Sequence, residues 1–151
     1  MQANGIASAV LFSCLLIVAS VWDCRKRIIP DTICITIAVL GLLTFHPAKL
    51  LGALLGLPFL IAALVKEGGM GGGDVKLAAT SGFVLGLPTA CVGTIIGLSA
   101  LLLWYIAIRV VYRVKKISTS PIVQTAIPLA PFLSLGFIGA MLLKTGGYLQ
   151  P

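Results

Sequence analysis

Long apolar runs, separated by short segments rich in charged or turn-forming residues, make up most of this 151-residue chain. Apolar residues account for 59% of the sequence and charged residues for only 10%, and the mean hydropathy is +1.12. A water-soluble domain needs a far more polar surface than this composition can supply. We therefore expect an all-α polytopic membrane protein, with the lipid bilayer as the solvent of most of its surface.

Six apolar stretches are candidates for helices that cross the membrane. A crossing helix needs about 20 apolar residues, although broken and packed helices are shorter. The fourth stretch is the shortest, since about 13 residues cover only roughly 20 Å of a roughly 30 Å hydrocarbon core. The stretches are Ala3–Trp22, Thr32–Phe45 (preceded by Ile28 and Ile29), Leu50–Val65, Val75–Leu87, Thr89–Tyr112 and Ile127–Leu143, with Pro88 between the fourth and the fifth.

The distribution of Lys and Arg predicts the orientation of these helices, because cytoplasmic loops collect positive charge. With six spans and the N-terminus outside, nine basic residues lie inside and two, Lys49 and Lys144, lie outside. If the fourth and fifth stretches were one helix, six would lie inside and five outside. Six spans with an outside N-terminus are therefore favoured. The nine inner residues are Arg25, Lys26, Arg27, Lys66, Lys76, Arg109, Arg113, Lys115 and Lys116.

We expect residues 1–151 to form a single membrane-embedded domain, since no long polar segment could hold a separate chemistry. The net charge is +7, but the basic residues form short clusters beside apolar runs, where they set topology, so no nucleic-acid partner is expected. The four cysteines include no Cys-x-x-Cys pair, and His46 is the single histidine. We therefore expect neither a metal site nor a cofactor.

All the acidic residues fall at or near helix ends on the predicted cytoplasmic side. Asp31 follows Pro30, so its carboxylate is expected to cap the N-terminus of the second helix. Glu67 lies next to Lys66 and is interpreted as a solvated carboxylate. The acidic residues are Asp23, Asp31, Glu67 and Asp74.

Asp23 and Asp74 are the stronger candidates for chemistry. Asp23 ends the first run, where the helix dipole disfavours a carboxylate, and a salt bridge to residues 25–27 is the alternative explanation. Asp74 follows residues 68–73, which include five glycines; it could be an N-cap, but a cap does not need them. Such glycines permit unusual backbone conformations and close approach of a peptide. Two aspartates at one membrane face could form a dyad, in which one carboxylate activates water and the other, kept protonated by repulsion, protonates the scissile amide.

Three segments resemble the signature segments of the type IV prepilin peptidases: residues 23–31, residues 69–78 with Gly-Gly-Gly-Asp-Val-Lys-Leu-Ala, and residues 127–136. The resemblance implies an aspartic endopeptidase of the cell membrane. Such an enzyme cleaves the basic leader from prepilins or pseudopilins at the cytoplasmic face. In the resemblance, Asp23 and Asp74 correspond to the catalytic pair, and Gly71, Gly73, Lys76, Pro128 and Pro131 to residues that bind substrate or shape the motifs.

The sequence is most similar to the compact, peptidase-only members, because the cytoplasmic segment with paired cysteines of the larger members is not in it. We therefore expect cleavage without cofactor and without methylation of the new N-terminus. Two alternatives stay open. One is a small ion- or proton-coupled transporter subunit, which would need charged groups deeper in the spans. The other is a different Gly-x-Gly-Asp intramembrane protease, with the same dyad and another substrate.

Overall fold

The computed structural model describes residues 3–43, 45–65, 71–114 and 128–146, and every element in these ranges is a helix. The all-α prediction is therefore confirmed for the described part of the chain. The elements are α1 (Ala3–Lys26), α2 (Asp31–Leu43), the 3-10 helix η1 (Pro47–Leu55), α3 (Gly56–Val65), α4 (Gly72–Leu85), α5 (Leu87–Val114) and α6 (Ala130–Thr145).

Among the described residues, three helical segments are long and apolar enough to cross a membrane: Ile6–Lys26, Pro47–Val65 and Leu87–Val114. The helices α2 and α6 are apolar but shorter, and α4 has only 14 residues. Many large apolar side chains on the outside of the bundle are exposed, which suits a surface covered by lipid rather than by water. The chain is thus a multi-pass membrane protein, and the exact number of spans and their orientation stay predictions.

Several helix boundaries differ from the ends of the predicted apolar stretches. The third stretch begins at Pro47 instead of Leu50, because η1 runs directly into α3. The helix α5 begins at Leu87 and includes Pro88 in its first turn, where a residue without an N–H is tolerated. The break before α5 is made by Gly86, whose φ of 82° is a left-handed conformation that favours glycine. The last helix begins at Ala130, and its expected start at residue 127 lies outside the described residues.

Close contacts between helix backbones hold the bundle together at two glycine-lined interfaces. In the first, a Cβ built on Gly136 of α6 would collide with backbone atoms of Gly93 and Gly97 in α5. In the second, Gly52 of η1 and Gly82 of α4 face each other so closely that a Cβ on either would collide with the other's carbonyl oxygen. Small residues at such crossings let helices pack by close backbone contact within the membrane.

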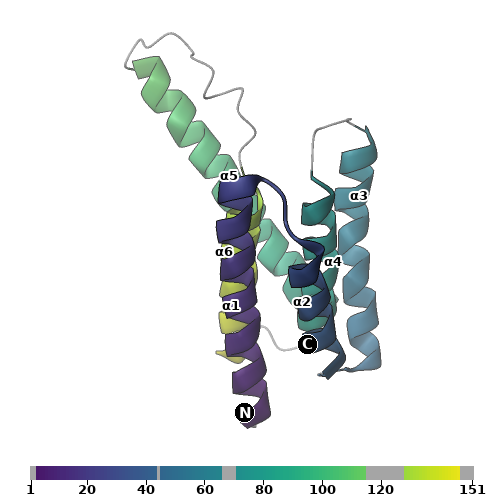
Figure 1. The fold of residues 1–151 in the computed structure, drawn as a ribbon. Coiled ribbons are helices and arrows are strands. Elements are labelled where there is room, and N and C mark those ends of the chain that lie inside the picture. Colours follow the sequence, from purple (N-terminus) through teal and green to yellow (C-terminus); the bar gives the residue numbers. More distant parts are fainter. Residues whose placement is uncertain (1–2, 44, 66–70, 115–127, 147–151) are drawn as a thin grey trace.

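Successive helical segments run in alternating directions, as Figure 1 shows. The helix α1 lies beside α6, and α4 packs between α2 on one side and η1 with α3 on the other. As a result, the C-terminus of α1 and the N-termini of α4 and α6 all lie at the same end of the molecule. This end carries the two candidate catalytic aspartates.

Candidate active site

Asp23 lies in the last turns of α1 and is almost completely buried, with 6% of its surface exposed. Its Oδ2 accepts a hydrogen bond from the backbone N–H of Ala130, the first residue of α6, at 3.1 Å. The expected alternative, a salt bridge to residues 25–27, is not formed within the described residues. The three basic side chains are exposed, and Lys26 stacks on Trp22 instead. The dipole of α1 therefore disfavours the negative charge of Asp23, and the N-terminus of α6 stabilises it.

The N-terminus of α6 lacks a capping side chain of its own, and Asp23 supplies one. The N-cap residue is Leu129, which has no side-chain acceptor, and the first turn contains Pro131, which has no N–H. Pro128 is half-buried just before the helix. The two prolines thus lie where the helix begins, and the N–H of Ala130 between them is directed at Asp23.

Two serines, the half-buried Ser20 of α1 and the buried Ser134 of α6, hold α6 against α1 one turn away from this contact. Ser20 Oγ donates to Ser134 Oγ at 2.8 Å, and Ser134 Oγ donates to the carbonyl oxygen of Leu16 at 3.1 Å. Both serines were missed by reasoning from the sequence. The available signal was their spacing: Ser20 precedes Asp23 by one helical turn, and Ser134 follows Ala130 by one turn, so each serine shares a helix face with its partner in the site.

Asp74 occupies a different environment in the first turn of α4, before the apolar stretch of that helix. Its Oδ1 is buried and has no hydrogen-bond partner among the described residues. Burial, and then the negative charge of Asp23, raise the pKa of Asp74 to about 6, and a backbone hydrogen bond from Gly71 partly opposes this rise. The two aspartates are therefore close enough to interact electrostatically, and Asp74 holds a proton more readily than an ordinary aspartate does.

The described glycines before Asp74 matter because they lack a side chain, and not because they adopt an unusual backbone conformation. Gly71 and Gly72 have no positive φ, so the expected conformational freedom is not used there. A Cβ on Gly73 would lie 2.9 Å from the Cβ of Ile29, which is too close, whereas a Cβ on Gly72 would meet nothing within 4 Å. Gly73 therefore lets α4 approach the connection between α1 and α2, and Gly72 leaves open space beside Asp74. The remaining glycines of the run lie outside the described residues.

Lys76 and Asp31 form an ion pair between α4 and α2, with Nζ and Oδ1 2.6 Å apart. The predicted N-cap is therefore wrong. The carboxylate of Asp31 accepts a hydrogen bond from Lys76 of another helix, and not from the backbone N–H groups of α2. It still lies in the first turn of α2, where the helix dipole favours it. Both side chains are more than half exposed, so the pair contributes little to stability. Glu67 lies outside the described residues.

No group of three metal-ligating side chains occurs in the parts of the chain that the structure describes. The site instead offers two carboxyl groups from two helices, one partnered by a helix N-terminus and one with an unpartnered oxygen. This combination suits general acid–base catalysis, which needs one group that takes a proton and one that gives it.

Comparison with known proteins identifies the family to which this chain belongs. A model of the type IV leader peptidase family matches residues 10–142, which include both aspartates and most of the described helices. The chain belongs to this family. It is also 34% identical over 143 residues to a prepilin leader peptidase/N-methyltransferase of Bacillus subtilis (strain 168). That match covers 89% of this chain and 54% of the relative, so the chain spans about half the length of the curated relative. No solved structure matches the chain.

Membership in the type IV leader peptidase family confirms the resemblance predicted from the three sequence segments. It also favours a peptidase over the ion- or proton-coupled transporter. The roles of the individual site residues are proposals, and the expected lack of methylation stays a prediction.

Proposed function

We propose that this protein is an aspartic endopeptidase that removes the basic leader peptide of type IV prepilins or pseudopilins at the cytoplasmic face of the cell membrane. The observation that carries the proposal is the placement of Asp23 and Asp74, brought from two helices to one end of the bundle. Family membership and the name of the relative support the reaction and the substrate class.

The different environments of the two aspartates divide the catalytic work between them. Asp23, whose oxygen faces the N-terminus of α6, is the ionised base that takes a proton from water. The hydroxide oxygen then attacks the scissile carbonyl carbon. Asp74, with its raised pKa, donates its proton to the leaving amine nitrogen as the peptide bond breaks. The water thus ends up in the two products, and the dyad has exchanged which carboxyl holds the proton.

The other predicted site residues shape this arrangement in the proposal. Gly71 leaves the main chain before Asp74 open to an extended substrate, because a Cβ there would contact only Asp74 Oδ2, at 3.6 Å, and Gly73 sets the position of the helix that carries Asp74. Lys76 and Asp31 tie α4 to α2 at the rim of the site. Pro128 and Pro131 flank the N–H that holds Asp23.

The depth of the dyad agrees with the substrate. A prepilin has a charged leader followed by an apolar helix, so the bond between them lies where the membrane meets the cytoplasm. The predicted topology places both aspartates at that level, and the exposed Arg25, Lys26 and Arg27 follow Asp23 directly.

Purified full-length protein in liposomes, mixed with a prepilin and followed by mass spectrometry of the new N-terminus, tests the proposal. We expect one cut between the basic leader and the apolar helix without added metal, and a product with a free amino terminus. An uncut prepilin, tested alongside a known leader peptidase that does cut it, would contradict the proposal. An added methyl group when S-adenosylmethionine is present would overturn the peptidase-only expectation.

The orientation has its own test with a membrane-impermeant thiol reagent. Cys24 is exposed beside Asp23, so it should react from the cytoplasmic side only. A cysteine placed at Lys49, at the opposite end of the molecule, should react only from outside. The reverse pattern would put the dyad on the wrong face for leader removal.

A further inference from the structure

The helix α1, which carries Asp23, is attached to the rest of the bundle mainly along α6. It packs less extensively on α2. The position of Asp23 relative to Asp74 therefore depends on how α1 is docked on α6.

The helix α6 is fixed in turn on α5. Gly136 of α6 lies so close to Gly93 and Gly97 of α5 that a Cβ on it would collide with their backbone atoms. Because α5 follows α4 directly after the turn at Gly86, this contact also ties α6 to the helix that carries Asp74.

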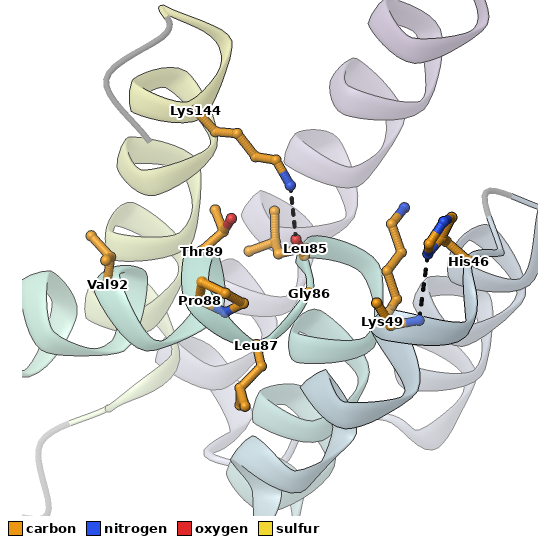
Figure 2. A pocket seen from close by; sticks show the side chains of 10 residues that line it. His46, Lys49, Leu85, Gly86, Leu87, Pro88, Thr89, Val92 and Lys144 are labelled. Carbon is orange, nitrogen blue, oxygen red and sulfur yellow. Dashed lines mark hydrogen bonds between the residues drawn. The ribbon is translucent and has the colours of Figure 1, made fainter. Parts of the chain in front are cut away.

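A hydrogen bond at the far end of α6 ties it to α4 directly. Lys144 Nζ donates to the carbonyl oxygen of Leu85, the last residue of α4, at 3.3 Å. A cation is favoured at this position by the dipole of α4. Figure 2 shows the bond beside a cavity of about 400 Å³ that Lys49 also lines. The helices α4, α5 and α6 are therefore connected by direct contacts, and α1 docks on them through α6.

Three oxygen atoms form a closed triangle between α1 and α6, which we call the serine clamp. Ser20 Oγ lies 2.8 Å from Ser134 Oγ and 2.8 Å from the carbonyl oxygen of Leu16. Ser134 Oγ lies 3.1 Å from the same carbonyl oxygen. Ser134 follows Ala130 by four residues, or about 6 Å along the helix. The clamp is therefore one turn away from the N–H that binds Asp23.

Directed bonds matter at this place because the side chains next to the clamp are apolar. Leu16, Ala19 and Leu133 are completely buried beside it. Apolar contacts are not directional, so they tolerate a small slide or rotation of one helix on the other. Hydrogen bonds require a defined distance and angle. The serine clamp therefore fixes the height and the rotation of α6 on α1.

We propose, on the basis of the proposed function, that Ser134 together with Ser20 is a positioning residue for peptide cleavage. By fixing α1 on α6, the clamp holds Asp23 at the place relative to Asp74 that the reaction needs. In this role neither serine touches the substrate, since both act through the helix that carries Asp23. A displacement of a catalytic group by about 1 Å can lower a rate by up to about 100-fold, so a small shift of α1 has a measurable effect.

The test measures kcat and KM for prepilin cleavage by the full-length protein in liposomes, with kcat given per folded molecule. Circular dichroism and thermal unfolding in detergent give the folded fraction. Ser134→Ala removes both contacts between the helices, so it should lower kcat about tenfold and leave KM within about twofold. Ser20→Ala leaves the contact of Ser134 with Leu16 and should lower kcat only about threefold. The double variant should match Ser134→Ala, because that change alone already opens the clamp.

Ser13→Ala is the matched control on the same helix. Ser13 is half-buried, and its Oγ donates to the carbonyl oxygen of Ala9 at 2.9 Å, just as Ser20 Oγ reaches that of Leu16. Among the described residues Ser13 has no hydrogen bond to α6. Its kcat should stay within about twofold of the wild-type value.

A wild-type kcat in folded Ser134→Ala, or an equal loss in Ser13→Ala, would contradict the positioning role and leave the proposed function intact. A rise in KM without a fall in kcat would contradict it too, because the serines would then act on substrate binding. If Ser134→Ala does not fold, the comparison of Ser20→Ala with Ser13→Ala decides in the same way. If the wild-type protein leaves the prepilin uncut, the proposed function fails, and the positioning role fails with it.

Discussion

The two aspartates of the site lie at the same end of the bundle, but they differ in how the rest of the protein contacts them. Asp23 is bound into the structure, because its carboxylate caps α6 and lies beside the Ser20–Ser134 contact. Asp74 lies in the first turn of α4, and its Oδ1 is buried without a hydrogen-bond partner among the described residues. The first carboxylate therefore joins two helices in addition to its proposed catalytic role, whereas the role proposed for the second is catalytic only. The predictions below separate these two roles.

The largest expected effect is the loss of activity when either carboxyl becomes an amide. Asp23→Asn and Asp74→Asn should each lower the rate of leader cleavage by at least a hundredfold, because an amide neither takes nor gives the proton. The matched control is Asp31→Asn, the same change on an exposed aspartate of the same end, and it should keep most of the activity. Substantial cleavage by either dyad variant, measured by product mass, would remove that residue from the mechanism.

The pH profile should reflect the raised pKa of Asp74. With a value of about 6, the carboxyl is protonated below that pH and ionised above it. As the proton donor, it should make kcat/KM fall by about tenfold for each pH unit above roughly 6. The Asp31→Asn variant should show the same fall in kcat/KM above pH 6. If the rate of the wild-type protein rises steadily from pH 6 to pH 8, the two aspartates have the opposite roles, or neither assignment is correct.

Packing at Gly73 should affect the position of Asp74. Gly73→Ala adds a Cβ 2.9 Å from that of Ile29, so α4 must shift, with a loss of stability of about 1–3 kcal/mol and of activity of order tenfold. Gly72→Ala is the matched control, since a Cβ there meets nothing within 4 Å and Ala favours a helix. Thermal unfolding in detergent and a cleavage assay measure both. Equal effects at the two glycines would argue against steric positioning.

Stability, measured apart from activity, should separate the two aspartates most clearly. Asp23→Ala removes the cap of α6 and should cost about 1–2 kcal/mol of unfolding free energy. Asp74→Ala removes a buried oxygen without a partner together with one hydrogen bond from the backbone of Gly71, and these opposite effects should leave stability nearly unchanged. Both variants should be inactive. A larger loss of stability for Asp74→Ala than for Asp23→Ala would reverse the comparison.

The smallest effect is expected at the ion pair between α2 and α4. Lys76→Ala should change the free energy of unfolding by less than about 1 kcal/mol, because both partners are largely exposed. Thermal unfolding with and without high salt measures it, and the same small change should follow Asp31→Asn. A loss of several kcal/mol would show that the pair holds the bundle together.

The all-helical class and the approximate position of each helix could be predicted from the sequence alone, and Asp23 and Asp74 could be chosen from it as candidate site residues. These features are local: an apolar run, a glycine run before an aspartate and a basic cluster after one are all visible within a few residues. The precise start of α5 was not predicted, because Pro88 signals a helix end as readily as it fits a first turn.

The tertiary structure decided what each charged residue contacts. Asp23 binds the N–H of Ala130, 107 residues later, and Asp31 binds Lys76, 45 residues later. For both aspartates, reasoning from sequence neighbours considered only local partners: a salt bridge was the alternative explanation for Asp23, and an N-cap was the expectation for Asp31. Neighbours along the chain do not reveal which helices pack together. The packing of α6 on α1 and of α4 on α2 brings distant partners closer than the local ones, and it also brings Lys49 and Lys144 to one cavity.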